Sequence, residues 1–119
     1  MRDRLFVLRP GFIDAAKGEG RFFCPYCAQV TGFLAYFPAV RETLDIIELD
    51  FPRPRAALVA LVGEAHQGAP LLILGDEREQ AEDQAAGVPI GEANGHRFVV
   101  KTLDILRYLA ATRGVPRPH

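Results

Sequence analysis

The chain contains two cysteines, Cys24 and Cys27, which lie three positions apart in the stretch CPYC. This spacing is typical of dithiol redox centres, in which one sulfur attacks a disulfide and the second resolves the mixed intermediate. Two other interpretations stay open. The pair can be half of a metal site, although zinc requires four ligands and the chain has no second C-x-x-C and no H-x₃₋₅-H. The two thiols can also be small apolar side chains of the core, where cysteine is often buried for no other reason.

A helix is predicted to begin at this pair, because apolar residues from Cys27 onward follow a three-and-four spacing that ends near Pro38. Pro25 suits the first helical position. Cys24 is then the N-cap, where free N–H groups and the helix dipole favour a thiolate, and Cys27 follows one turn later on the same face. We therefore expect Cys24 to be the nucleophile and Cys27 the resolving thiol. Gly32, in the middle of this helix, indicates close approach of another backbone.

Four short apolar runs predict strands, at residues 5–8, 44–49, 71–74 and 96–100. Two further helices are predicted, one beginning at Arg53-Pro54 and one capped by Thr102. The resulting order, β-α-β-α-β-β-α, predicts an α/β fold with a four-stranded mixed sheet and helices on both of its faces. The first two strands should be parallel, because a helix connects them.

Two segments are longer than simple connections, residues 10–23 and residues 75–95. Both are interpreted as extended loops. The second can contain a short helix near residues 78–86, because long loops without structure are uncommon. Its acidic part, residues 76–83, is interpreted as a solvated face.

Length and composition predict one domain spanning residues 1–119, with 49% hydrophobic and 24% charged residues. A net charge of −1 gives no support to nucleic-acid binding or to a polybasic membrane contact. No apolar run is long enough for a signal peptide or a membrane span, so a cytoplasmic location is expected. In a reducing cytosol, paired cysteines are more often catalytic or metal-binding than structural.

The CPYC tetrapeptide is the signature of the dithiol glutaredoxins, and the predicted element order over residues 4–113 resembles their thioredoxin-like fold. This resemblance implies a three-layer α/β/α architecture and thiol–disulfide exchange, with glutathione as a co-substrate and no tightly bound cofactor. Members of that superfamily carry a cis-proline before the third strand, facing the cysteines, and Pro70 fills this position. In those proteins the residue before this proline pairs its backbone with the peptide part of glutathione, and the resemblance implies this role for Ala69.

Further binding residues are implied by the same resemblance. Residues 101–110, KTLDILRYLA, look like the end of the N-terminal domain of glutathione transferases, and Thr102 matches a serine of that segment. Lys101 stands where these proteins carry an acid or amide that receives the ammonium of glutathione. Arg21, three residues before the first cysteine, matches a basic residue of glutaredoxins, and Tyr26 is expected to form the groove wall.

The two extended segments make the chain resemble short bacterial thioredoxin-like proteins more than mainstream glutaredoxins. Glutathione or a protein disulfide is the expected partner, whereas nucleic acid and membranes are not. Arg53 and Arg55 flank Pro54, in a region that contacts a glutathione carboxylate in some glutaredoxin-like folds, and they are interpreted here as exposed side chains. The alternative function is a non-catalytic binding module on the same fold, homodimeric or weakly metal-binding, with a large apolar contact surface.

Overall fold

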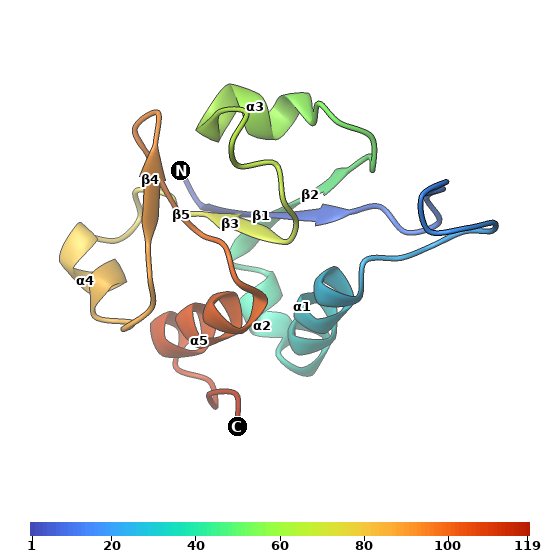
Figure 1. Ribbon diagram of the computed structural model, residues 1–119. Helices are drawn as coiled ribbons and strands as arrows, with labels where there is room; N and C mark the ends of the chain where they lie inside the picture. Colours follow the sequence, from blue (N-terminus) through green and yellow to red (C-terminus); the bar gives the residue numbers. More distant parts are fainter.

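The computed structural model describes all 119 residues, and an open mixed sheet of five strands forms its centre. The strands are β1 (Asp3–Leu8), β2 (Leu44–Leu49), β3 (Leu71–Ile73), β4 (Gly91–Ala93) and β5 (His96–Val99). The helices are α1 (Pro25–Tyr36), α2 (Pro38–Arg41), α3 (Ala56–Val62), α4 (Gln80–Gln84) and α5 (Thr102–Arg113). One face of the sheet carries α3, and the other carries α1, α2 and α5 (Figure 1). None of the helices has the length and apolar character needed to cross a membrane.

The strand order in the sheet is β2-β1-β3-β5-β4. Strands β1 and β2 are parallel and aligned over their whole length, with Asp3 opposite Leu44 and Leu8 opposite Leu49. This confirms the predicted pairing of the first two strands. β3 is antiparallel to β1, and β5 is antiparallel to β3. All three residues of β3 are buried, as expected of a continuous apolar run covered by helices on both faces.

The prediction of four strands is wrong, because a fifth strand, β4, pairs antiparallel with β5 at the edge of the sheet. A two-residue turn joins them, and both of its residues have positive φ, 50° at Asn94 and 76° at Gly95. An Asn-Gly pair is the preferred sequence for such a hairpin turn. The local signal was therefore present, but a strand of three partly exposed residues gives almost no hydrophobic pattern.

Residues 75–95 are anchored by buried charges rather than lying free in solvent. Asp83 of α4 is only 1% exposed, accepts a hydrogen bond from the Tyr108 hydroxyl and forms an ion pair with Arg97. The interpretation of residues 76–83 as a solvated face is thus wrong at this position. Burial raises the pKa of Tyr108 well above its usual value, and the hydrogen bond to Asp83 adds to the shift. A second buried carboxylate, Asp3 of β1, pairs with Arg113 of α5 at 3.0 Å.

Residues 10–23 form a narrow arm that extends away from the sheet (Figure 1). Phe12 and Phe22 form an antiparallel bridge across it. The ring of Phe12 stacks on Phe51 with centroids 4.5 Å apart, which holds the base of the arm against the loop that follows β2. The predicted loop is thus a hairpin-like structure with an aromatic contact to the body of the protein.

Helix α1 ends at Tyr36, just before Pro38 as predicted, and Pro38 then begins the short helix α2. A proline at the first helical position loses no hydrogen bond, which allows this restart. A Cβ atom built on Gly32, in the middle of α1, would meet no atom within 4 Å. The prediction that Gly32 admits a close backbone neighbour is therefore wrong.

Replacing Gly32 with alanine should raise the free energy of unfolding by about 1 kcal/mol, because alanine loses less backbone entropy in a helix and the site has room for its methyl group. Urea unfolding followed by circular dichroism measures the change. Ala35→Gly, at an exposed position of the same helix, is the matched control and should lower stability by about the same amount. A destabilised Gly32→Ala protein would contradict the open space seen at this position.

Candidate active site

The two cysteines occupy the N-terminus of α1 as free thiols. Cys24 is the N-cap, with an extended backbone (φ −78°, ψ 113°), and its Sγ accepts a hydrogen bond from the backbone N–H of Cys27 at 3.1 Å. Pro25 is the first helical residue, and the first turn contains no acidic side chain. The Cys24 sulfur therefore lies where helix N–H groups stabilise negative charge and where no carboxylate of that turn opposes it.

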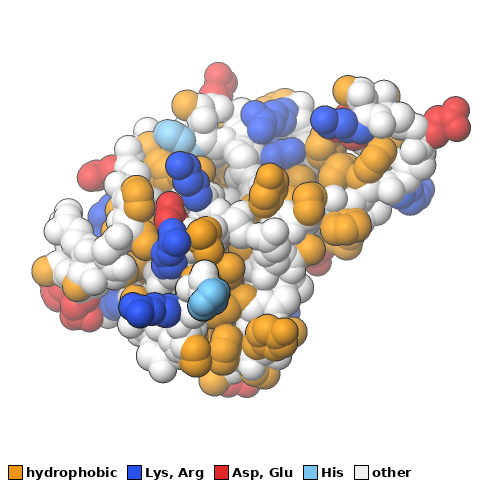
Figure 2. All heavy atoms as spheres, turned by 60° about the horizontal axis from the view of Figure 1, so that its bottom comes forward, with side chains coloured by type: hydrophobic (Ala, Val, Ile, Leu, Met, Phe, Trp, Pro, Cys, Tyr) orange, Lys and Arg blue, Asp and Glu red, His pale blue; other side chains and the backbone are white.

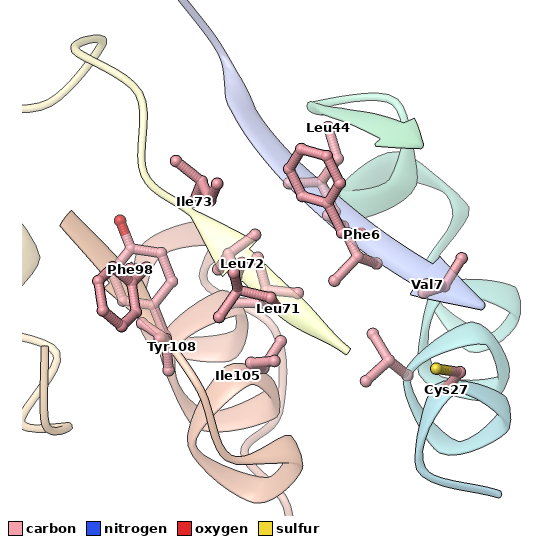
Figure 3. Close-up of a cluster of buried hydrophobic side chains, with 14 of the residues drawn as sticks. Phe6, Val7, Cys27, Leu44, Leu71, Leu72, Ile73, Phe98, Ile105 and Tyr108 are labelled. Atoms are coloured by element: carbon pink, nitrogen blue, oxygen red, sulfur yellow. The ribbon is translucent and has the colours of Figure 1, made fainter. Parts of the chain in front are cut away.

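Cys27 lies one turn further along α1 and faces the core next to β1 (Figure 3). It is 4% exposed, and its Sγ accepts a hydrogen bond from the backbone N–H of Leu8 at 3.4 Å. Burial raises the pKa of Cys27 to about 12, and the hydrogen bond with Cys24 adds to this, whereas the Leu8 N–H and the positive charge of Arg55 act in the opposite direction. Cys27 is therefore a protonated thiol at neutral pH, and the partly exposed Cys24 is the sulfur that a substrate can reach first.

The stability of the reduced protein should decrease as the pH rises above about 8.5, the ordinary pKa of a cysteine in the unfolded chain. Between that pH and about 12, the unfolded state has lost the Cys27 proton while the folded state retains it. The loss can reach about 1.4 kcal/mol per pH unit. Urea unfolding of wild type and Cys27→Ala at pH 8, 9 and 10, with a reductant present, measures it. Parallel pH profiles for the two proteins would contradict the raised pKa.

The loop before β3 brings two predicted residues to the dithiol. The Ala69–Pro70 peptide bond is cis, and the Ala69 carbonyl oxygen lies 3.9 Å from the Cys24 Sγ. Ala69 and Pro70 are 45 and 46 positions away from Cys24 in the chain, so only the sheet topology brings them together. A substrate bonded to Cys24 would lie against the Ala69 backbone.

A groove of about 440 Å³ lies beside this point, here called the Tyr26 groove. Its lining residues are Tyr26, Gln29, Ala69, Pro70, Val100, Lys101, Thr102 and Leu103. Four of the five predicted binding residues thus gather around one groove. Tyr26, Val100 and Leu103 are exposed apolar side chains at 45–59%, and Figure 2 shows hydrophobic side chains gathered on the side of the molecule that carries α1 and α5.

The positive end of α5 also contributes to the Tyr26 groove. Thr102 is the first residue of α5 rather than its cap, since Lys101 is the N-cap and makes no side-chain capping hydrogen bond. The prediction of a Thr102 cap is therefore wrong by one residue. Lys101 is the one charged residue of the lining, so the groove favours an anionic group on whatever binds there.

Arg21, the fifth predicted binding residue, is not brought to the groove. It lies in the arm formed by residues 10–23, where its guanidinium donates to the backbone oxygen of Gly11 at 2.7 Å. The spacing to Cys24 matched the glutaredoxin pattern, but the arm places the side chain elsewhere. The structure therefore gives Arg21 a role within the arm.

Arg55 is a charged residue near the dithiol that sequence reasoning missed. Its side chain is buried, with only 7% of its surface exposed, rather than exposed as the sequence suggested. Its guanidinium donates to the backbone oxygens of Phe51 (2.8 and 3.1 Å) and Gln67 (2.6 Å). It forms no ion pair with a carboxylate. Burial lowers the pKa of Arg55 and repulsion from Arg53 adds to this, whereas both cysteines act in the opposite direction. A buried positive charge thus acts on the two thiols without a competing anion.

The cysteines have no further metal ligands within this chain, because no three His, Cys, Asp or Glu side chains gather in a way that could hold a metal ion. A zinc site at Cys24 and Cys27 would need two ligands from another molecule. The arrangement of the chain's own side chains thus gives the metal interpretation no support.

Comparison with known proteins gives one match. The model of a family described as "Protein of unknown function (DUF3088)" matches residues 2–117. No curated protein and no solved structure matches the chain significantly. The match covers nearly the whole fold, including the dithiol and the Tyr26 groove.

Proposed function

The chain belongs to the DUF3088 family of proteins of unknown function, and for this member we propose a thiol–disulfide oxidoreductase activity carried by Cys24 and Cys27. The observation that carries the proposal is the asymmetry of the pair. Cys24 is partly exposed at the positive end of α1, whereas Cys27 is buried behind it with its proton retained. These are the properties that an attacking and a resolving thiol require.

In the proposed reaction, the Cys24 thiolate attacks one sulfur of a substrate disulfide. A bond forms between Cys24 and that sulfur, the substrate S–S bond breaks, and the other substrate sulfur leaves as a thiolate. Cys27 then loses its proton to the solvent or to the departing thiolate and attacks the Cys24 sulfur. The second substrate thiolate leaves, and the enzyme holds a Cys24–Cys27 disulfide. Two molecules of a small thiol such as glutathione restore the dithiol and become a disulfide themselves.

The second step requires a thiolate at Cys27, although its pKa is about 12. Two groups lower the energy of this thiolate, the Leu8 N–H, which already donates to the sulfur, and the buried charge of Arg55. Both are fixed in place by the sheet and by backbone carbonyls, so no rearrangement is needed when charge develops. The Leu8 N–H and Arg55 therefore assist the attack of Cys27 on the Cys24 sulfur, a step that would be slow for a thiol of this pKa in water.

The thioredoxin-like assignment of the fold is part of the same proposal. It is supported by the dithiol at the start of the helix after β1, by the parallel β1–β2 pair and by a cis-proline before β3. Helix α4 and strand β4 are inserted between β3 and β5. The substrate class that suits the Tyr26 groove is a mixed disulfide whose non-sulfur part is apolar or anionic, because Lys101 would repel an ammonium group.

Intact mass spectrometry tests the activity. After incubation of the reduced protein with oxidised glutathione, the protein should lose two hydrogens through formation of the Cys24–Cys27 disulfide. A stable glutathione adduct on wild type would contradict the resolving role of Cys27. No change in mass would remove the enzymatic proposal and leave a non-catalytic binding module.

A further inference from the structure

A second groove, here called the α1 groove, lies between α1 and the sheet face formed by β1 and β2, with a volume of about 620 Å³. Its walls include Val7, Ile46, Phe23, Ala28, Gly32 and Ala35. Both cysteine sulfurs belong to residues that line it, whereas neither cysteine lines the Tyr26 groove. The two grooves share no lining residue, so the dithiol can be approached from two separate directions.

The small residues of α1 keep the α1 groove open. One side of α1 lines the groove with three small residues, Ala28, Gly32 and Ala35. A Cβ atom built on Gly32 would meet no atom within 4 Å. A glycine in mid-helix costs about 1 kcal/mol relative to alanine, and no backbone contact here requires it. The volume lies within the range of small-molecule binding sites. The glycine at position 32 thus makes the helix less stable at a place where a longer side chain would occupy the groove.

The walls of the α1 groove suit an alkyl chain better than a peptide. The N–H and C=O groups of α1 are used within the helix, and β1 is paired with β2 on one side and with β3 on the other. β2 is an edge strand, but its free backbone groups point outward in the plane of the sheet and not from the face that lines the groove. A peptide between these walls would bury its own backbone groups without partners, which is costly. An alkyl chain has no polar groups to satisfy and gains from burial against apolar walls.

One unpaired charge lies at the far end of the α1 groove. Arg41 of α2, beyond the C-terminal end of α1, lines the groove and forms no ion pair. Glu48 also lines it, and its carboxylate lies 3.9 Å from Arg9, whose guanidinium is shared with Asp50. From Cys24 to Ala35 the helix rises about 16 Å. A ligand that fills the groove therefore spans from the dithiol to a free guanidinium.

We propose that the α1 groove binds a linear alkyl chain with an anionic head group, the head group against Arg41 and the chain extending towards Cys24 and Cys27. This binding does not depend on the redox activity, because it requires the walls of the groove and Arg41 but no reaction at sulfur. It can therefore succeed or fail separately from the proposed function.

Isothermal titration of the full chain with decanoate tests the head group. Decanoate should bind saturably below the concentration at which it self-associates, and about threefold more tightly than decanol, as expected for a partly exposed ion pair. Arg41→Gln should remove this preference, whereas Arg21→Gln, which changes an exposed arginine of the arm, should retain it. Equal or tighter binding of decyltrimethylammonium would overturn the assignment of an anionic ligand.

Gly32→Leu tests the place of binding, because its side chain would enter the α1 groove. The affinity for decanoate should fall at least about tenfold, since the apolar surface is then covered by the protein itself. Tyr36→Leu, at an exposed position of α1 outside the groove, is the matched control and should leave the affinity unchanged. Ala28→Leu provides a second variant if Gly32→Leu unfolds.

Three outcomes would overturn the proposal. The first is the absence of saturable decanoate binding, and the second is binding that both Gly32→Leu and Ala28→Leu leave unchanged. The third is a wild-type dimer, detected by sedimentation, that these substitutions dissociate, because a second copy of the chain would then occupy the groove.

Discussion

Replacing Cys24 with serine is expected to reduce turnover of a glutathionylated peptide by at least about a thousandfold, because a serine hydroxyl is not ionised at neutral pH and is a poor nucleophile towards sulfur. Replacing Cys27 with serine should have a different effect. The first attack by Cys24 remains, but no thiol behind it can release the intermediate. The Cys27→Ser protein should therefore accumulate one glutathione on Cys24, which wild type does not retain.

Turnover assays combined with intact mass measurements distinguish these two variants. Both should keep the circular dichroism spectrum of wild type, because serine is close to cysteine in size and Cys24 is only partly buried. Turnover that survives Cys24→Ser would contradict the assignment of the nucleophile. A glutathione adduct on Cys27 in the Cys24→Ser protein would reverse the two roles.

Replacing Arg55 with glutamine is expected to slow alkylation of Cys27 by iodoacetamide at pH 7 several-fold, because the positive charge of Arg55 opposes the raised pKa of Cys27 and a nearby opposite charge favours the thiolate. Arg55 is suited to this role because its hydrogen bonds go to carbonyl oxygens and no carboxylate neutralises its charge. The dependence of the Cys27 alkylation rate on pH should move to higher pH in the variant.

The same substitution has a structural cost, which a second variant separates from the electrostatic effect. Losing the bonds to the oxygens of Phe51 and Gln67 should destabilise the fold by about 2 kcal/mol. Arg55→Lys should also be destabilised, because an ammonium cannot reach both carbonyls, yet it should retain most of the alkylation rate at pH 7. Equal slowing in both variants would indicate a purely structural role. Arg53→Gln is the control for a charge change nearby.

The sequence predicted the features that depend on local chemistry. The helix that begins at Cys24 follows from a proline at the first helical position and an apolar period behind it, and the structure shows this cap. The parallel pairing of β1 and β2 follows from the helix between them. The meeting of Cys24 with Ala69 was expected from a family resemblance, and no property of residue 69 alone indicated it.

The features that the sequence did not predict depend on tertiary contacts. Arg55 looked like an exposed residue because nothing local reveals that Phe51 and Gln67 would turn their carbonyls towards it. Arg21 had the expected spacing to Cys24, but the aromatic contacts of the arm displaced it. Asp83 belonged to an acidic stretch, and only its packing against Tyr108 distinguishes it from its exposed neighbours.

The ion pair between Asp3 and Arg113 has a consequence for synthesis on the ribosome. These residues are 110 positions apart, and both are at most 5% exposed at the side chain. A buried carboxylate without a partner is strongly unfavourable. The Asp3 carboxylate has a second partner, Arg78, at 3.0 Å, so both of its arginines lie at least 75 positions downstream. The first strand can therefore reach its final burial only after the middle of the chain has left the exit tunnel, and the pair with Arg113 forms last.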